Sequence, residues 1–117
     1  MKGKYAALVY EGNRKLNLYN YELPKAGLNE VVIKVSRAAI CGTDIHKFRA
    51  SEDAVETING ELAIAGHEPS GWISEIGEGV KELSTGQRVL VAGVFSCNTC
   101  YQCRSGFNTA CENSISG

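Results

Sequence analysis

Residues 66–80 read GHEPSGWISEIGEGV. The segment from Pro69 to Ile76 is predicted to form a strand with Trp72 in the core, and the Gly-Glu-Gly sequence that follows it favours a turn. His67 and Glu68 stand just ahead of this strand, and an imidazole and a carboxylate are both common zinc ligands. We therefore interpret this stretch as a strand whose beginning carries two candidate metal ligands, with Glu68 either coordinating the metal or orienting the site.

The rest of the chain favours short strands joined by glycine-rich turns. Thirteen glycines in 117 residues suit a small, strongly bent β-barrel, because glycine permits the corners and positive φ angles that such barrels need. One short helix is predicted over 43–49, and the stretch 50–61, which carries Glu52, Asp53 and Glu56, is predicted to be an exposed loop. The other predicted strands, of which the first three form a β-meander, cover residues 4–10, 15–21, 30–38 and 88–94.

A lone cysteine, Cys41, begins the segment CGTDIH. Because it precedes the predicted helix, in which Thr43 would be the N-cap and Asp44 would meet the helix dipole, its thiol should ionise and bind metal readily. Thr43 and His46 are three residues apart, so their side chains share a helix face and could pass a proton from a buried site to solvent. Taken singly, Cys41 would be an ordinary buried residue and His46 an ordinary surface residue.

The other four cysteines form a C-x2-C-x2-C-x7-C run. Four thiolates close a tetrahedral shell around zinc and leave no position for substrate, so the run is predicted to be a structural zinc site that holds a protruding loop, about residues 95–113. An iron–sulfur cluster also uses four thiolates, although the x3-C-P ending of a ferredoxin run is missing, and disulfides or free thiols are further alternatives. The predicted ligands are Cys97, Cys100, Cys103 and Cys111.

Charge and hydropathy exclude several classes of function. The net charge is only −1, so no strong field attracts nucleic acid or anionic lipid. The longest apolar runs are far shorter than the roughly 20 residues of a membrane span, and no signal peptide is visible. We therefore expect small molecules or other proteins as partners. Because four of the five cysteines cluster and no secretion signal precedes them, we expect a reducing, cytoplasmic compartment, in which clustered thiols bind metal more often than they pair.

Together the three motifs resemble those of zinc-containing medium-chain alcohol dehydrogenases. The pattern G-H-E-x2-G-x5-G-x2-V is similar to that family's signature, and the CGTDIH segment and the four-cysteine run match the family in the expected order. The resemblance implies a mainly β, GroES-like β-barrel with a few short helices over residues 1–117. It also implies a zinc-dependent dehydrogenase of the alcohol, polyol or threonine type, acting on a small alcohol or polyol and forming a homo-oligomer.

The resemblance implies a role for each matching residue. Cys41 and His67 correspond to two ligands of a catalytic zinc ion, and Glu68 corresponds to the neighbouring carboxylate. Thr43 corresponds to the hydroxyl that takes the alcohol proton, and His46 to the relay toward solvent. In the family, zinc polarises the alcohol oxygen for hydride transfer to NAD or NADP. The clustered cysteines correspond to the structural zinc lobe.

Some features of the family have no match here. Gly42 stands where some liver-type members carry an arginine that contacts the cofactor pyrophosphate. The family's third catalytic ligand and its Rossmann domain follow the structural loop, and the only G-x-G, at residues 77–79, lacks its third glycine because Glu82 takes that place. We therefore predict no cofactor-binding residue here, and a truncated catalytic domain that is inactive alone. One alternative is a stand-alone, zinc-stabilised GroES-like binding or assembly module. Another is a zinc-free reductase, although the cysteines argue against it.

Overall fold

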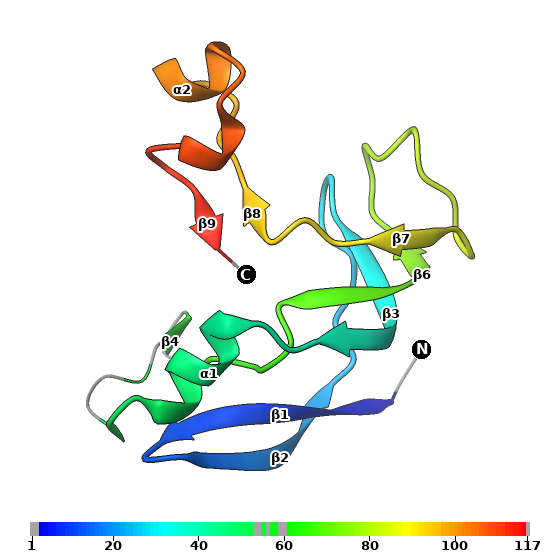
Figure 1. Cartoon of the computed structure of the whole chain (residues 1–117). Helices are drawn as coiled ribbons and strands as arrows, with labels where there is room; N and C mark the ends of the chain where they lie inside the picture. The colour runs from blue at the N-terminus through cyan, green and yellow to red at the C-terminus, as the bar shows by residue number, and fades with distance from the viewer. Residues whose placement is uncertain (1–2, 53–54, 56, 59–60, 117) are drawn as a thin grey trace.

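The computed structural model describes residues 3–52, 55, 57–58 and 61–116. Short strands dominate it and its helices are brief, which confirms the predicted mainly β class (Figure 1). None of the described helices has the length and apolar character needed to cross a membrane. In chain order the elements are β1 (Lys4–Gly12), β2 (Lys15–Glu22), β3 (Val31–Ala39), α1 (Gly42–Arg49), β4 (Thr57–Ile58), β5 (Glu61–Leu62), β6 (Glu68–Ile76), β7 (Arg88–Leu90), β8 (Val94–Phe95), α2 (Tyr101–Arg104), the 3-10 turn η2 (Asn108–Ala110) and β9 (Ile115–Ser116).

β1 and β2 form an antiparallel hairpin that closes between the strands predicted over 4–10 and 15–21. Asn13 and Arg14 both have positive φ, 49° and 62°, as a type I′ hairpin turn requires. The N–H of Asn13 donates to the carbonyl of Ala50 at 2.7 Å, and the N–H of Arg14 donates to that of Phe48 at 3.0 Å. These bonds tie the end of the hairpin to the end of α1, which packs on β1 (Figure 1).

β3, β6 and β7 form a second antiparallel sheet with β6 in the middle. The predicted meander is therefore wrong, because β3 pairs with β6 rather than with β2. The connection between β2 and β3, residues 23–30, is longer than a tight hairpin turn, so the chain leaves the first sheet there. Gly71 permits the close pairing of β3 and β6, since a Cβ atom at this position would stand 2.1 Å from the carbonyl oxygen of Lys34.

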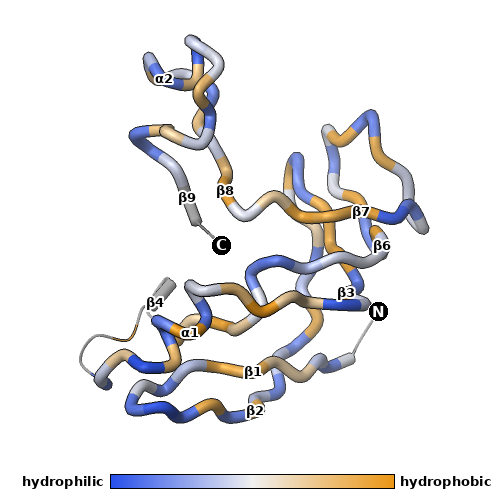
Figure 2. The backbone as a smooth tube through the Cα atoms, viewed as in Figure 1, coloured by the Kyte–Doolittle hydropathy of each residue, from blue (hydrophilic) through white to orange (hydrophobic). Residues whose placement is uncertain are grey.

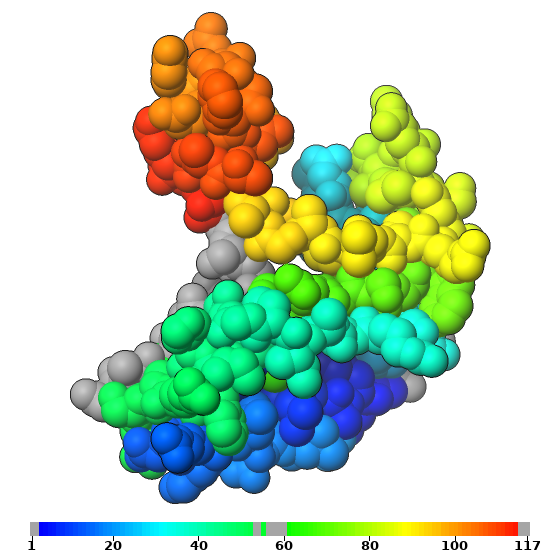
Figure 3. Space-filling view, in the orientation of Figure 1, coloured from blue at the N-terminus to red at the C-terminus, as the bar shows by residue number. Residues whose placement is uncertain are grey.

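The predicted strand over 88–94 is divided in the structure. β7 ends at Leu90, the chain bends at Gly93, and β8 then pairs with β9 instead of continuing the sheet. The segment from β8 to β9, residues 94–116, forms a lobe that stands away from the two larger sheets (Figures 1 and 3). We call this segment the cysteine lobe. It is the protruding loop that the sequence predicts.

Two further predictions need correction. Thr43 is not the N-cap of α1, which begins at Gly42 with Cys41 as its N-cap, because the carboxylate of Asp44 accepts the Cys41 N–H at 2.8 Å. The stretch 50–61 is not a plain loop, since β4 and β5 pair there as a short hairpin. Glu52 is exposed as predicted, whereas Asp53 and Glu56 lie outside the described residues.

The core lies where β1 meets the segment before β6. Val9 is 1% exposed, Ala63 is 2% exposed and Ile73 on β6 is 1% exposed. The prediction that Trp72 belongs to the core is wrong, because it is 42% exposed. Side chains alternate along a strand, so the inward position of Ile73 turns its neighbour outward. Figure 2 shows apolar residues along β1 and β7.

Candidate metal centres

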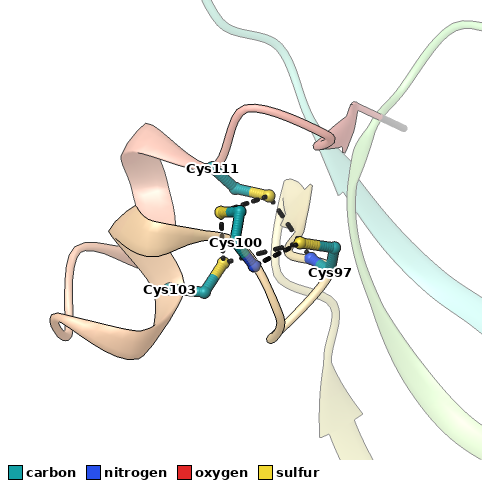
Figure 4. A group of neighbouring side chains, drawn as sticks. All are labelled: Cys97, Cys100, Cys103 and Cys111. Atoms are coloured by element: carbon teal, nitrogen blue, oxygen red, sulfur yellow. Dashed lines mark hydrogen bonds between the residues drawn. The ribbon is translucent and has the colours of Figure 1, made fainter.

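The cysteine lobe brings its four thiols to one point (Figure 4). Cys97 follows β8, Cys100 is the N-cap of α2, Cys103 lies within α2 and Cys111 ends η2. All four sulfur atoms lie within 4.8 Å of one another. Two short helical turns and the loop between them therefore place side chains from a span of fifteen residues around a single centre.

The spacing of the sulfurs fits one tetrahedral metal ion. The sulfur of Cys100 is 3.5 Å from that of Cys103 and 3.9 Å from that of Cys111, and the sulfurs of Cys97 and Cys103 are 4.0 Å apart. A tetrahedron with zinc–sulfur bonds of about 2.3 Å has edges of about 3.8 Å. All five cysteines of the chain are free thiols, so the disulfide alternative does not apply to this structure. The donor set suits zinc, and sulfurs at these distances could share one ion.

Hydrogen bonds make the four thiols unequal. The sulfur of Cys97 accepts bonds from the Thr99 hydroxyl at 3.4 Å, from the Thr99 N–H at 3.5 Å and from the Cys100 N–H at 3.3 Å. These bonds lower the pKa of Cys97 to about 5, and the bond from the Thr99 hydroxyl has the largest effect. Burial and the thiol of Cys100 raise the pKa of Cys103 to about 12. The N–H of Cys103 lowers the pKa of Cys100 as well. At neutral pH the lobe therefore offers Cys97 as a ready thiolate, whereas a metal must deprotonate Cys103.

A second donor group forms where α1 and β6 begin. Cys41 precedes α1, His67 precedes β6 and Glu68 is the first residue of β6. The sulfur of Cys41 lies 3.2 Å from Nε2 of His67, and both lie with a carboxylate oxygen of Glu68 within 4.8 Å of one another. A thiolate, an imidazole and a carboxylate are a donor set that fits zinc. Three protein donors leave a fourth position free, in contrast to the closed shell of the lobe.

Glycine makes the approach to His67 possible. Gly66 has a φ of +90°, which an L side chain rarely adopts, and a Cβ atom there would lie 2.9 Å from Cβ of Ala38. Ala39 of β3 pairs with Glu68 of β6, so the chain beyond β3 runs beside the chain that enters β6. This register places Cys41 next to His67 although they are 26 residues apart.

Asp44 supports both of these ligands. The residue is 5% exposed, and its Oδ2 accepts the Cys41 N–H while its Oδ1 lies 3.4 Å from Nδ1 of His67. A partner at Nδ1 leaves Nε2, the nitrogen that faces Cys41, available to a metal. The hydroxyl of Tyr10 donates to the same Oδ1 at 2.6 Å.

Sequence reasoning assigned Asp44 only to the helix dipole and missed Tyr10. Burial alone would raise the pKa of Asp44, but the Cys41 N–H, the Tyr10 hydroxyl and the nearby His67 together lower it. Burial and the carboxylate of Asp44 raise the pKa of Tyr10, so the phenol keeps its proton. The position of Asp44 three residues after an N-cap could have indicated its contact with Cys41, whereas no local signal marks Tyr10.

Thr43 and His46, the predicted proton-transfer residues, both lie on α1. Their side chains are exposed, and the i, i+3 spacing places them on one side of the helix. His46 is not part of the donor group of Cys41, His67 and Glu68. The structure brings together the predicted ligands, and the roles of Thr43 and His46 stay predictions.

The molecule is thus a small β domain with one closed and one open group of metal donors. Its residues 27–117 match the alcohol dehydrogenase GroES-like domain. The chain therefore belongs to the alcohol dehydrogenase GroES-like domain family, which confirms the resemblance of the motifs and the predicted GroES-like fold class.

Curated relatives include oxidoreductases of two kinds. The chain is 35% identical over 115 residues to zinc-type alcohol dehydrogenase B of Aspergillus flavus, a match that covers 97% of this chain and 26% of the relative. It is 43% identical over 93 residues to L-threonine 3-dehydrogenase of Legionella pneumophila strain Corby, covering 80% of this chain and 27% of the relative. The chain thus spans about a quarter of the length of these relatives.

Solved structures share the fold. A short chain alcohol dehydrogenase (rspB) from Escherichia coli CFT073, complexed with NADH, matches with a TM-score of 0.81 and 32% identity over 96% of this chain and 31% of that one. A cobalt- and zinc-bound thermostable alcohol dehydrogenase from Pyrobaculum aerophilum matches with a TM-score of 0.80 and 31% identity over 94% of this chain and 32% of that one. At the level of the family, zinc and nicotinamide cofactors therefore accompany this fold.

Proposed function

We propose that this chain is the metal-binding, substrate-side domain of a zinc-dependent, NAD(P)-linked alcohol or polyol dehydrogenase. The observation that carries the proposal is the pairing of a closed four-thiolate group with a separate group that has an open position. A closed shell suits a structural ion, and an open position suits an ion that receives substrate. The nucleotide would be held outside these 117 residues, because the relatives are several times longer than the match.

Each residue of the open group has a proposed task. Cys41 and His67 bind the metal, and Asp44 holds Nδ1 of His67 so that Nε2 faces the ion. Glu68 either coordinates or orients the site from the start of β6. Zinc at such a site polarises the oxygen of an alcohol, which favours loss of hydride to a nicotinamide.

The proton of the alcohol needs a route to water. We assign the first acceptor to the Thr43 hydroxyl and the next to the His46 imidazole, because both are exposed on the helix that begins at Cys41. An exposed imidazole exchanges protons with solvent near neutral pH. Replacing His46 with Gln should then lower the rate of alcohol oxidation most strongly below pH 7, while a variant at an exposed site outside α1, such as Lys81→Gln, should not.

Metal content tests the proposal directly. The intact enzyme should hold two zinc ions per chain, Cys41→Ser should remove one of them, and Cys111→Ser should remove the other. The Cys41→Ser variant should keep its fold and lose activity. If the intact and folded protein instead holds one ion in the lobe and no metal at Cys41, this result would favour a zinc-stabilised binding or assembly module.

The substrate class rests on the relatives. Both an alcohol dehydrogenase and a threonine dehydrogenase are among them, so we propose a secondary alcohol, a sugar alcohol or a hydroxy amino acid as the substrate. A panel of these compounds, tested with NAD and with NADP, would identify the substrate and the cofactor together. Sedimentation of the same enzyme would test the proposed homo-oligomer.

A further inference from the structure

Tyr10 is a buried tyrosine that touches the open metal centre from a remote strand. It lies on β1, is 3% exposed, and donates its hydroxyl to Oδ1 of Asp44 at 2.6 Å across a separation of 34 residues. It is not one of the metal donors. A phenol this well buried commonly packs as an apolar ring, but its one polar atom here meets the carboxylate that supports two ligands.

The two oxygens of Asp44 serve different partners. Oδ2 accepts the N–H of Cys41 at 2.8 Å, and Oδ1 accepts the Tyr10 hydroxyl while lying 3.4 Å from Nδ1 of His67. The bond from Tyr10 is the shortest of the three, and it acts on the oxygen that faces the imidazole. Without the Tyr10 hydroxyl, the Cys41 N–H alone would hold the Asp44 carboxylate. The orientation of Oδ1 toward His67 would then be less well fixed.

The backbone of β1 also aligns the segment that leads to His67. The N–H of Tyr10 donates to the carbonyl of Ala63 at 3.1 Å, and the N–H of Ala65 donates to the carbonyl of Leu8 at 2.8 Å. The tyrosine therefore meets both ligand-bearing segments, one through its backbone and one through its hydroxyl.

We propose that Tyr10 is a positioning residue of the open metal centre, whose hydroxyl fixes the Asp44 carboxylate so that His67 presents Nε2 beside Cys41. This inference rests on the proposed function for the identity of the centre as a metal site. It adds a contribution from β1, which carries no ligand, to the affinity of that site.

Cobalt titration of the intact protein, with zinc already in the cysteine lobe, tests the inference. The absorption of a cobalt–thiolate bond reports binding at Cys41, since the lobe thiols are occupied. Tyr10→Phe removes one hydroxyl and should weaken cobalt binding about threefold to tenfold, the effect of one net hydrogen bond. Tyr19→Phe is the matched control, because among the described residues the Tyr19 hydroxyl bonds only to Glu11, at an exposed position on the hairpin. This variant should change the affinity less than about twofold.

Further measurements separate positioning from general loss of stability. Once Asp44→Asn has weakened the site, about tenfold or more, adding Tyr10→Phe should have little further effect, because both act through one carboxylate. In the metal-free wild type, NMR of the imidazole should show His67 with its proton on Nδ1, a result that needs no folded variant.

Equal cobalt affinities for Tyr10→Phe and Tyr19→Phe would overturn the inference and leave the proposed function standing. Additive effects of Tyr10→Phe and Asp44→Asn, or a His67 proton on Nε2, would overturn it as well. Failure of the wild type to bind cobalt beyond the lobe would instead overturn the proposed function, and this inference with it.

Discussion

Removing the metal from the cysteine lobe should unfold the lobe and leave the two larger sheets intact. Between residues 94 and 114, Cys111 is the only buried residue that the structure describes. Phe95, Tyr101 and Phe107, the large apolar side chains, are 52%, 75% and 63% exposed. The lobe therefore has almost no apolar core of its own.

The magnitudes favour the metal over apolar burial. Complete burial of such a side chain contributes about 2–3 kcal/mol, so three side chains that are more than half exposed contribute about 3 kcal/mol together. A structural zinc ion on four cysteines contributes on the order of 10 kcal/mol to folding in small zinc domains. Loss of the ion should therefore remove most of the free energy that orders residues 96–113.

Hydrogen exchange followed by mass spectrometry measures this effect. After treatment with a chelator under reducing conditions, amides from 96 to 113 should exchange at the rate of an unfolded peptide, while those of β1 and β6 should keep their protection. Cys41→Ser, which removes a ligand from the other centre, should leave the lobe protected. Persistent protection of the lobe after complete removal of zinc, with its thiols reduced, would refute the reasoning.

Two other properties follow from single positions. Gly71→Ala should lower the free energy of unfolding by about 1–3 kcal/mol in urea denaturation, because the new Cβ would overlap the carbonyl of Lys34, whereas Gly42→Ala, which meets open space, should not. Zinc binding to the lobe should release protons and weaken as the pH falls, because the pKa of Cys103 is raised to about 12 whereas the pKa of Cys97 is lowered to about 5. Calorimetry in buffers of different ionisation enthalpy counts the released protons, and a zinc-binding constant that is unchanged between pH 6 and pH 8 would contradict this prediction.

The short-range features of the chain were predictable because their signals are local. The four lobe cysteines lie within one loop, and their spacing alone indicates a closed shell. The break between the first two predicted strands and the helix predicted over 43–49 also follow from neighbouring residues. Such features need no knowledge of which strands pair.

The features that the sequence analysis missed depend on contacts between remote segments. The predicted meander was wrong because β2 and β3 are joined by the long connection of residues 23–30, which allows β3 to pair with the remote strand β6. Trp72 was assigned to the core on its residue type, although strand alternation beside Ile73 points it outward. The bond from Tyr10 to Asp44 joins residues that only the packing of β1 against α1 brings together.

The two metal centres therefore differ in how much of the fold they require. The lobe centre assembles from one short loop, but Cys41 and His67 meet only because β3 and β6 pair up to Ala39 and Glu68. A displacement of β3 relative to β6 should therefore change the geometry of the open centre and leave that of the lobe unchanged. Gly71→Ala forces such a displacement, so it should weaken cobalt binding at Cys41 while the lobe keeps its zinc, and equal losses at both centres would show that the lobe also depends on the sheet.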